Sequence, residues 1–191
     1  MLGANLRRKK ILMIIAPENF RDEELFVPKR IFEEAGASVE IASSRSGPIR
    51  GMLGGTATPD LLLAEAGAEK YDAIVVVGGS GSPAHLWPDE TLRRLLREAD
   101  RQRKIIGAIC LAGAALARAG LLDGRSATIY KTRDSLDEYL RAGAIYDSRD
   151  VVVDDRYVTA SGPRVAREFG EAIVERLRRD GIAATARKET Q

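Results

Sequence analysis

The amino-acid sequence predicts an α/β fold in which a mainly parallel sheet is flanked by helices. Strand-like and helix-like segments alternate from one end of the chain to the other, the pattern typical of such sheets. The 191 residues suffice to bury one sheet between two layers of helices, and no interdomain linker, repeat or low-complexity segment interrupts them. We therefore expect a single domain over residues 9–180, with flexible termini at 1–8 and 181–191.

Seven segments have the composition of strands. They cover residues 10–16, 38–42, 71–77, 104–110, 125–130, 151–154 and 156–161. The last two are joined at Asp154 and Asp155, which predicts an antiparallel pair. The glycine-rich segment 47–58 predicts a hairpin-like excursion, because glycine and turn residues dominate it.

Six segments have apolar residues at helical spacing or follow a strand as short helices. They cover residues 22–35, 59–66, 89–103, 111–117, 135–142 and 165–179. Gly36 and Gly120 are typical stop signals after two of them. Pro28 lies inside the first helix and predicts a kink or restart there, since proline removes one helix hydrogen bond. The turn around Glu24 would then be held apart from the rest of that helix.

Composition argues against several classes of partner. The net charge of +2 results from 30 basic and 28 acidic residues spread along the chain, so no extended basic surface indicates nucleic acid or a membrane. The basic cluster 7–10 directly precedes a strand and is interpreted as a solvated lead-in. No apolar run approaches the ~20 residues of a membrane span. With no secretory signal and a single cysteine, a cytoplasmic protein is expected.

The single cysteine, Cys110, is the first candidate for chemistry. It closes the apolar strand 104–110 and is followed at once by a helix, so its thiol lies on a strand-to-helix elbow at the ligand-binding edge of the sheet. A helix N-terminus favours thiolate over thiol, which predicts a nucleophile. The alternative is a small apolar residue at a buried strand end.

A nucleophilic cysteine needs an acid or base beside it. His85, the only histidine, lies in the loop after the glycine-rich turn and could approach the site, although a surface histidine with no chemical role is the favoured interpretation. Four carboxylates follow the first strand: Glu18, Asp22, Glu23 and Glu24. One of them could donate a hydrogen bond to sulfur, or all could simply favour a helix start. One histidine and one cysteine are too few for a zinc site.

Backbone donors form a second candidate group. Gly78 and Gly79 end the strand before the cysteine strand, and the backbone N–H after Cys110 opens the helix. Two such donors beside the sulfur would form an oxyanion hole for a thiolate that attacks a carbonyl.

Five segments of the chain resemble the ThiJ/PfpI superfamily in order and spacing. They are Phe-Arg-Asp-Glu-Glu-Leu-Phe-Val-Pro at 20–28, Val-Val-Val-Gly-Gly at 75–79, Ala-Ile-Cys-Leu-Ala-Gly at 108–113, Ala-Gly-Leu-Leu-Asp-Gly-Arg at 119–125, and Val-Val-Val-Asp-Asp-Arg-Tyr-Val-Thr-Ala-Ser-Gly-Pro at 151–163. The resemblance covers about residues 9–179. It implies a flavodoxin-like three-layer sandwich of the class I glutamine amidotransferase-like type.

The resemblance also implies roles for particular residues. Cys110 is the elbow nucleophile, Glu24 is the carboxyl group beside it, and the N–H groups of Gly79 and Leu111 form the oxyanion hole. It also implies a homodimer or a higher homo-oligomer, since family members are usually dimers and protease-like members form hexamers. No cofactor is expected, because the sulfur and the carboxyl group supply both the nucleophile and the acid or base.

The chain departs from the superfamily pattern at the histidines. The protease-like branch has histidine where this chain has Leu111, and the deglycase branch has histidine at the position of Tyr130. The protease-like branch also has glutamates at the positions of Arg21 and Ala84, the latter contributed by a neighbouring subunit. A Cys-His-Glu triad is therefore hard to assemble from these residues. Tyr130 and His85 remain auxiliary candidates, with a purely structural tyrosine as the alternative for Tyr130.

Three functions follow from these residues. The first is a cofactor-independent enzyme in which Cys110 adds to a small reactive carbonyl and Glu24 relays the proton, as in a glyoxalase or deglycase. The second is a redox-sensing or chaperone-like stress protein in which Cys110 is oxidised to a sulfinic acid. The third is an intracellular cysteine peptidase acting on peptides, which the missing histidines disfavour.

Overall fold

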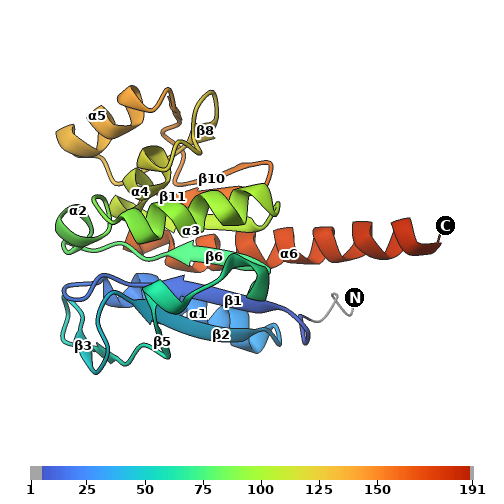
Figure 1. The fold of residues 1–191 in the computed structure, drawn as a ribbon. Coiled ribbons are helices and arrows are strands. Elements are labelled where there is room, and N and C mark those ends of the chain that lie inside the picture. Colours follow the sequence, from blue (N-terminus) through green and yellow to red (C-terminus); the bar gives the residue numbers. More distant parts are fainter. Residues whose placement is uncertain (1–5, 190–191) are drawn as a thin grey trace.

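A seven-stranded sheet forms the centre of the molecule (Figure 1). The computed structural model describes residues 6–189, with the backbone alone over 182–189. The strand order is β10-β11-β7-β6-β1-β2-β5, and every neighbouring pair is parallel except β10 with β11. The strands are β1 (Lys10–Ile14), β2 (Ser38–Ser43), β5 (Leu61–Leu62), β6 (Ala73–Val76), β7 (Ile105–Ile109), β10 (Val151–Asp154) and β11 (Tyr157–Ala160).

Helices and two small ribbons complete the fold. The helices are α1 (Asp22–Glu34), α2 (Ser82–His85), α3 (Glu90–Arg101), α4 (Gly113–Arg118), α5 (Arg133–Arg141) and α6 (Ala166–Glu189), with 3-10 turns at Leu63–Glu65, Ala68–Lys70, Cys110–Ala112 and Pro163–Val165. The ribbons are the antiparallel pair β3 (Ile49–Arg50) and β4 (Thr56–Ala57), and the parallel pair β8 (Ser126–Ala127) and β9 (Ile145–Tyr146).

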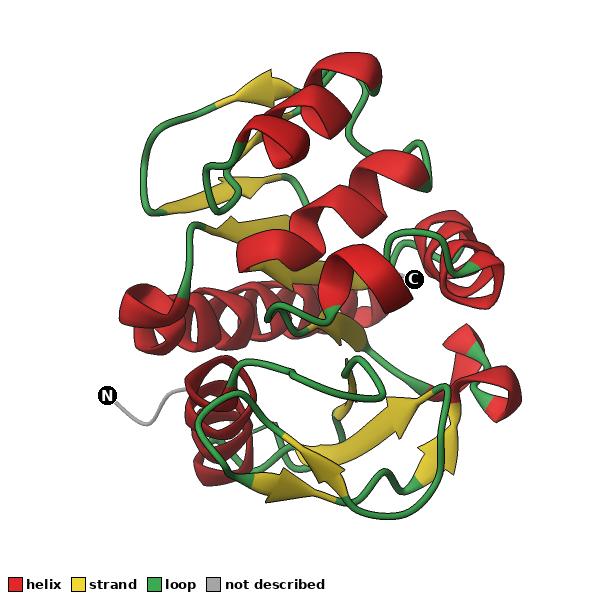
Figure 2. Ribbon diagram, turned by 90° about the vertical axis from the view of Figure 1, so that its left-hand side faces the viewer, coloured by secondary structure: helices red, strands yellow, loops and turns green. Residues whose placement is uncertain are grey.

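Two apolar cores lie on opposite faces of the sheet. Along β1, Ile11 and Met13 belong to one core while Leu12 and Ile14 belong to the other, because successive strand side chains point to opposite faces. α1 and α6 cover the first core, and α3 with α4 covers the second. Figure 2 shows helices on both sides of the strands. The predicted three-layer α/β sandwich is thus confirmed.

Two predicted elements are wrong in type or length. Residues 59–66 do not form a helix: Leu61–Leu62 pair with β2 as strand β5, followed by a single 3-10 turn, because backbone pairing with residues 42 and 43 outweighs the local preference. The strand expected over 125–130 shrinks to Ser126–Ala127 and joins β9 in a side ribbon, because β10 and not this segment extends the main sheet. Strand β9 and helix α2 were not predicted.

Helix boundaries differ in three places. α1 continues through Pro28 without a restart, since the 13 residues from Asp22 to Glu34 form one helix. The helix after Cys110 begins as a 3-10 turn and becomes α-helical at Gly113. α6 extends to Glu189, beyond the expected end at residue 179. Of the termini expected to be flexible, residues 1–5 and 190–191 lie outside the described residues.

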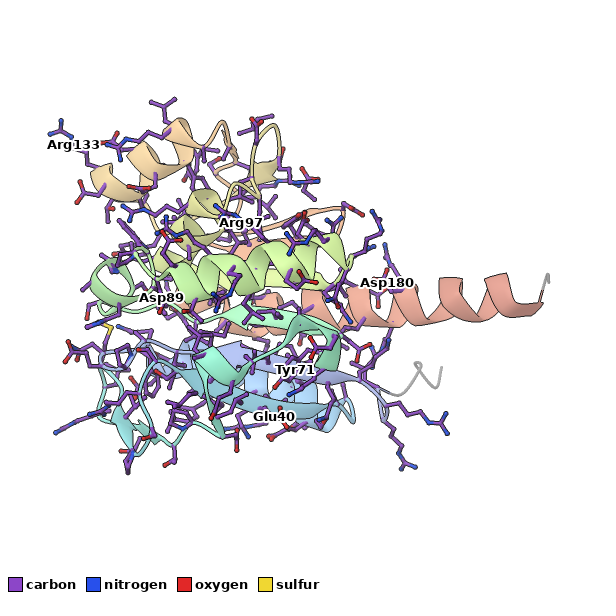
Figure 3. All side chains as sticks on the ribbon, in the orientation of Figure 1. Glu40, Tyr71, Asp89, Arg97, Arg133 and Asp180 are labelled. Atoms are coloured by element: carbon purple, nitrogen blue, oxygen red, sulfur yellow. The ribbon has the colours of Figure 1, made fainter. Side chains whose placement is uncertain are left out.

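Polar side chains secure element ends far from the cysteine. Asp89 caps α3, its carboxylate accepting the Leu92 N–H at 2.9 Å. The Tyr71 hydroxyl donates to Glu40 Oε2 at 2.5 Å and ties the start of β6 to β2; both side chains are labelled in Figure 3. The predicted hairpin over 47–58 is present as β3 and β4.

The carboxyl ends of β1, β6 and β7 share one edge of the sheet, because these neighbours run parallel. In Figure 1 helix α2 and ribbon strand β3 lie at the same end of the molecule, opposite the C-terminal end of α6. This edge is where open α/β sheets place ligand sites.

Candidate active site around Cys110

Cys110 occupies a strained turn directly after β7. Its φ is +59°, in the left-handed region that residues other than glycine rarely adopt. The cysteine is not part of a disulfide, and 7% of the residue is exposed. Such strain persists only where the surrounding structure imposes it, and it is concentrated at functional sites. The predicted strand-to-helix elbow is present, with β7 on one side and the 3-10 turn Cys110–Ala112 on the other.

Glu24 lies beside the thiol, fully buried in the first turn of α1. Its Oε2 accepts the Gly78 N–H at 3.0 Å, and the Cys110 thiol acts on the pKa of this carboxyl group. The other oxygen, Oε1, is buried and has no hydrogen-bond partner within residues 6–189. Gly78 allows this approach: a Cβ there would lie 2.5 Å from Glu24 Oε2 and 2.7 Å from Cys110 Cβ. Among the four acidic candidates, the structure brings Glu24 to the sulfur.

Burial controls the protonation of this pair. It raises the pKa of Glu24 to about 8, against the opposing effects of the Cys110 and Gly78 hydrogen bonds and the Arg21 charge. The carboxyl group therefore holds its proton at neutral pH. Burial, followed by the charge of Glu24, raises the pKa of the Cys110 thiol. The prediction that the helix start favours the thiolate is therefore wrong, because desolvation outweighs the backbone donors. A protonated Glu24 removes that repulsion and can donate its O–H to the thiolate.

The backbones of Leu111 and Gly79 border Cys110. Both act to lower the pKa of the thiol. Gly79 has a φ of +120°, and a Cβ there would lie 2.4 Å from Asn19 O, so only glycine fits. The structure thus assembles Cys110, Glu24, Gly79 and Leu111 at one point. This arrangement can stabilise negative charge on sulfur or on an oxygen bonded beside it.

The auxiliary candidates are placed differently. His85 ends α2, and its Nε2 lies 2.9 Å from Glu18 Oε1 in a partly exposed pair, so a carboxylate rather than the thiol engages it. Tyr130 is 49% exposed, and its ring approaches Gly162, which follows β11. The Tyr130 hydroxyl makes no hydrogen bond within the described part of the chain. Neither side chain forms a hydrogen bond or an ion pair with Cys110 within residues 6–189.

The sequence did not predict the contacts of Trp87 and Arg21 near Cys110. Trp87 Nε1 donates to the carbonyl oxygen of Leu111 at 2.7 Å and so supports the turn directly after Cys110. Arg21 ends the loop before α1 and acts electrostatically on both Cys110 and Glu24. The signal available for Trp87 was its position two residues after the only histidine. No local pattern indicates the role of Arg21.

Asp22 has a structural role in the neighbouring loop. Its two carboxylate oxygens accept the N–H groups of Leu53 and Gly55, each at 2.7 Å. Met52 in the same loop places its sulfur 3.3 Å from the Ser80 N–H. The loop 51–55 is thereby held against the segment that follows Gly79.

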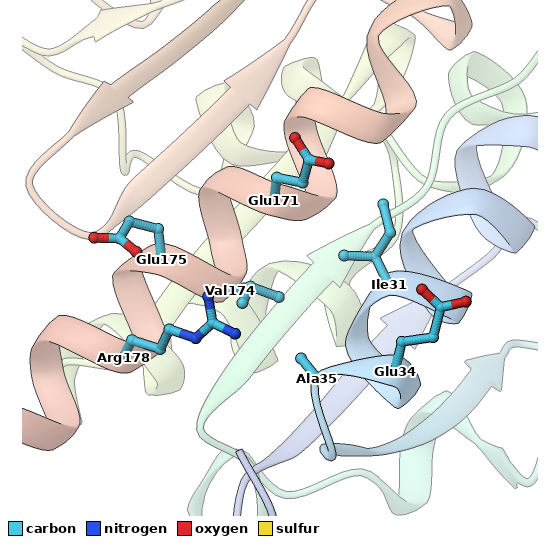
Figure 4. Close-up of a pocket in the computed structure, with 7 residues that line it drawn as sticks. All are labelled: Ile31, Glu34, Ala35, Glu171, Val174, Glu175 and Arg178. Carbon is cyan, nitrogen blue, oxygen red and sulfur yellow. The ribbon is translucent and has the colours of Figure 1, made fainter. Parts of the chain in front are cut away.

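Outside the Cys110 site, the described residues form a surface pocket but no metal-binding cluster. Within residues 6–189, no group of three or more His, Cys, Asp and Glu side chains has an arrangement suited to a metal ion. A surface pocket between α1 and α6 is lined by Ile31, Glu34, Ala35, Glu171, Val174, Glu175 and Arg178, all labelled in Figure 4, and contains none of the predicted site residues. No helix in this range combines the length and apolar composition needed to cross a membrane.

Comparison with known proteins identifies relatives of this chain. The DJ-1/PfpI family matches residues 9–176. An uncharacterised protein, MJ0967 of Methanocaldococcus jannaschii, is 42% identical over 92% of this chain and 86% of its own length. Deglycase PfpI of Pyrococcus furiosus is 34% identical over 81% of this chain and 90% of its own. The glutathione-independent glyoxalase DJR-1.2 of Caenorhabditis elegans is 29% identical over 89% of both.

A solved structure supports the same assignment. The ThiJ/PfpI domain protein of Brachyspira murdochii superposes with a TM-score of 0.84 at 33% identity, covering 91% of this chain and 98% of that one. With a family match over most of the sequence and the same fold at this identity, the chain belongs to the DJ-1/PfpI family.

Proposed function

We propose that this protein is a cofactor-independent enzyme that uses Cys110 to transform small reactive carbonyl compounds, in the manner of a glyoxalase or deglycase. The observation that carries the proposal is the position of Cys110 beside the buried carboxyl group of Glu24: a Cβ on Gly78 would lie 2.5 Å from Glu24 Oε2 and 2.7 Å from Cys110 Cβ. The Gly79 and Leu111 backbones act to lower the pKa of the same thiol. The names glyoxalase and deglycase borne by two relatives support the same chemistry.

For an α-oxoaldehyde the steps balance without a cofactor. The sulfur adds to the aldehyde carbon, and the carbonyl oxygen takes a proton to form a hemithioacetal. Glu24 then moves the proton of that carbon to the neighbouring ketone carbon through an enediol, leaving a thioester and a hydroxyl group. Water cleaves the thioester, releases the hydroxy acid and restores the thiol. The aldehyde carbon is oxidised while the ketone carbon is reduced, so no outside oxidant is needed.

Glu24 suits the proton transfer. With a pKa of about 8 it can hold or release a proton near neutral pH, as a general acid and base must. The backbone donors would stabilise the oxyanion that forms when sulfur adds to the carbonyl. His85 is not required in this scheme, and its pairing with Glu18 agrees with that.

The test is conversion of methylglyoxal to lactate. We expect the unmodified protein to form lactate, and Cys110→Ser and Glu24→Gln to lose most of that activity. Tyr130→Phe is the matched control, because its exposed hydroxyl is outside the hydrogen-bond network of the cysteine. An unmodified protein that forms no lactate would exclude the enzyme proposal.

A redox-sensing role is the second candidate. The protonated carboxyl group of Glu24 could donate to an oxygen of a Cys110 sulfinic acid, which would favour that oxidation state. Mild peroxide should then raise the mass of the protein by two oxygens, and Cys110→Ser should prevent the increase. Resistance of Cys110 to peroxide would exclude this role.

The peptidase alternative has the least support, because a histidine partner for the cysteine is missing from residues 6–189. We also propose a homodimer or a higher homo-oligomer, an expectation drawn from the family. Sedimentation velocity would test it, and a monomer at micromolar concentration would contradict it.

A further inference from the structure

We propose that Arg21 forms a subsite for a negatively charged group beside Cys110, so that the preferred carbonyl substrates carry a carboxylate next to the reactive carbonyl. The substrate class rests on the proposed function; the anion subsite itself requires only a reactive thiol.

Backbone contacts place Arg21 at the site. Its N–H donates to the carbonyl oxygen of Gly78 at 2.9 Å, and a Cβ on Gly79 would lie 2.5 Å from the same nitrogen. Arg21 is the residue before α1, three positions before Glu24. Gly78 also donates its N–H to Glu24, and a Cβ on Gly78 would lie 2.7 Å from Cys110 Cβ. The arginine therefore borders the reactive centre from the α1 side.

The Arg21 guanidinium is held by one carboxylate and keeps a free side. Its Nε donates to Glu23 Oε2 at 2.7 Å and its Nη2 donates to Glu23 Oε1 at 3.0 Å. Its Nη1 makes no hydrogen bond in the described part of the chain. The side chain of Arg21 is 27% exposed, so a ligand in solvent can reach it. A guanidinium with spare donors is well suited to a carboxylate.

The guanidinium stays positively charged, and each acidic group near it is paired or protonated. The pKa of Arg21 is raised, first by its hydrogen bonds to Glu23 and further by the charges of Glu24 and Cys110. Glu24 is largely protonated at neutral pH. Asp22, the remaining carboxylate of this turn, is engaged by the Leu53 and Gly55 N–H groups. Arg21 thus offsets the repulsion between a thiolate and an anionic carbonyl compound.

Alkylation of Cys110 tests the subsite without any turnover. Iodoacetate is anionic and iodoacetamide is neutral, while both transfer a similar group to the thiolate and release iodide. The ratio of their rate constants cancels changes in thiolate content and reports the local charge. We expect Arg21→Gln to lower the iodoacetate-to-iodoacetamide ratio by about fivefold.

Two further variants sharpen the test. Glu23→Gln should raise the same ratio about twofold or more, because it frees the guanidinium from its carboxylate, and it tests the subsite even if Arg21→Gln misfolds. Arg101→Gln is the matched control, since Arg101 is also paired with a nearby glutamate, Glu98, but ends α3 at the opposite edge of the sheet. An unchanged ratio in both Arg21→Gln and Glu23→Gln would overturn the proposal.

Protection by glyoxylate extends the test to the substrate class. Glyoxylate carries an aldehyde next to a carboxylate and should slow iodoacetamide labelling of the unmodified protein but not of Arg21→Gln. Equal protection of both proteins would contradict carboxylate recognition by Arg21. If the labelling ratio depends on Arg21 while methylglyoxal yields no lactate, the subsite stands and the proposed enzyme activity fails; the reverse pair of results removes only the subsite.

Discussion

Glu24 Oε2 accepts the backbone N–H of Gly78 at 3.0 Å, and this bond joins the first turn of α1 to the segment after β6, beside Cys110. The carboxyl group is completely buried, so its other oxygen is available to the thiol rather than to water. Because burial penalises a charged carboxylate, the contact sets both the protonation of the site and a cost in stability.

The first prediction concerns stability against pH. Folded Glu24 keeps its proton up to about pH 8, whereas an unfolded glutamic acid loses it near 4.5, so the free energy of unfolding falls as the pH rises between these values. Glu24→Gln removes this pH-dependent loss of stability. The free energy of unfolding of the variant, relative to that of the unmodified protein, should increase by about 3–5 kcal/mol from pH 4.5 to pH 8. Urea unfolding at several pH values measures the difference.

Glu138→Gln is the control of opposite sign. The pKa of Glu138 is lowered, mainly by its hydrogen bonds from Arg118, so the ionised carboxylate stabilises the folded state above pH 4.5. Glu138→Gln should destabilise the protein at neutral pH, and the deficit should shrink as the pH falls through the lowered pKa. A pH-independent difference for Glu24→Gln would contradict the burial argument.

The second prediction concerns Gly78. An added Cβ would lie 2.6 Å from Ile109 O as well as against Glu24 and Cys110, so backbone atoms must move. We expect Gly78→Ala to lower the free energy of unfolding by about 2–3 kcal/mol and to slow iodoacetamide labelling of Cys110. Gly181→Ala, with no atom within 4 Å of the new Cβ, should keep the labelling rate. Normal labelling in Gly78→Ala would count against the proposed packing.

The third prediction concerns Trp87. Trp87→Phe keeps most of the ring but removes the donor to Leu111 O, so the turn after Cys110 loses an anchor. We expect a loss of about 1–3 kcal/mol and slower labelling of Cys110. Arg97→Met is the matched control, because it also removes a side-chain donor to a backbone carbonyl. Arg97, on α3 and labelled in Figure 3, donates its Nε–H to Ala119 O at 2.9 Å. That variant should lose stability without any change in labelling; equal labelling in both variants would deny Trp87 a positioning role.

The fourth prediction concerns the backbone of Cys110. At a φ of +59° an alanine side chain costs about 1–2 kcal/mol, while glycine adopts this conformation freely. Cys110→Gly should therefore unfold at higher urea than Cys110→Ala. At Ala112, whose φ is −64°, the order is reversed and Ala112→Gly should destabilise. A less stable Cys110→Gly would show that the turn is not strained.

Apolar patterning was sufficient to predict the centre of the molecule. The continuous runs at β1, β6 and β7 predicted buried parallel strands, and the turn at Asp154 and Asp155 predicted the antiparallel pair of β10 and β11. These elements depend on which residues avoid water, a property that each short segment carries by itself.

Some residues of the candidate site could be predicted from the sequence, and others could not. Cys110 was identifiable from the change of strand to helix around it, and the resemblance to a family selected Glu24, Gly79 and Leu111. The contacts of Trp87, Arg21 and His85 depend on residues 2 to 67 positions away, and no local pattern encodes them.

By itself, the sequence determined the α/β sandwich, its buried strands and the elbow that carries Cys110, because hydrophobic periodicity and turn residues act locally. Only the tertiary structure decided that Leu61–Leu62 join the sheet as β5, that His85 pairs with Glu18, and that Arg21 borders the thiol. Those outcomes arise from competition among distant hydrogen-bond and charge partners, which is resolved only when the sheet brings its strand ends together.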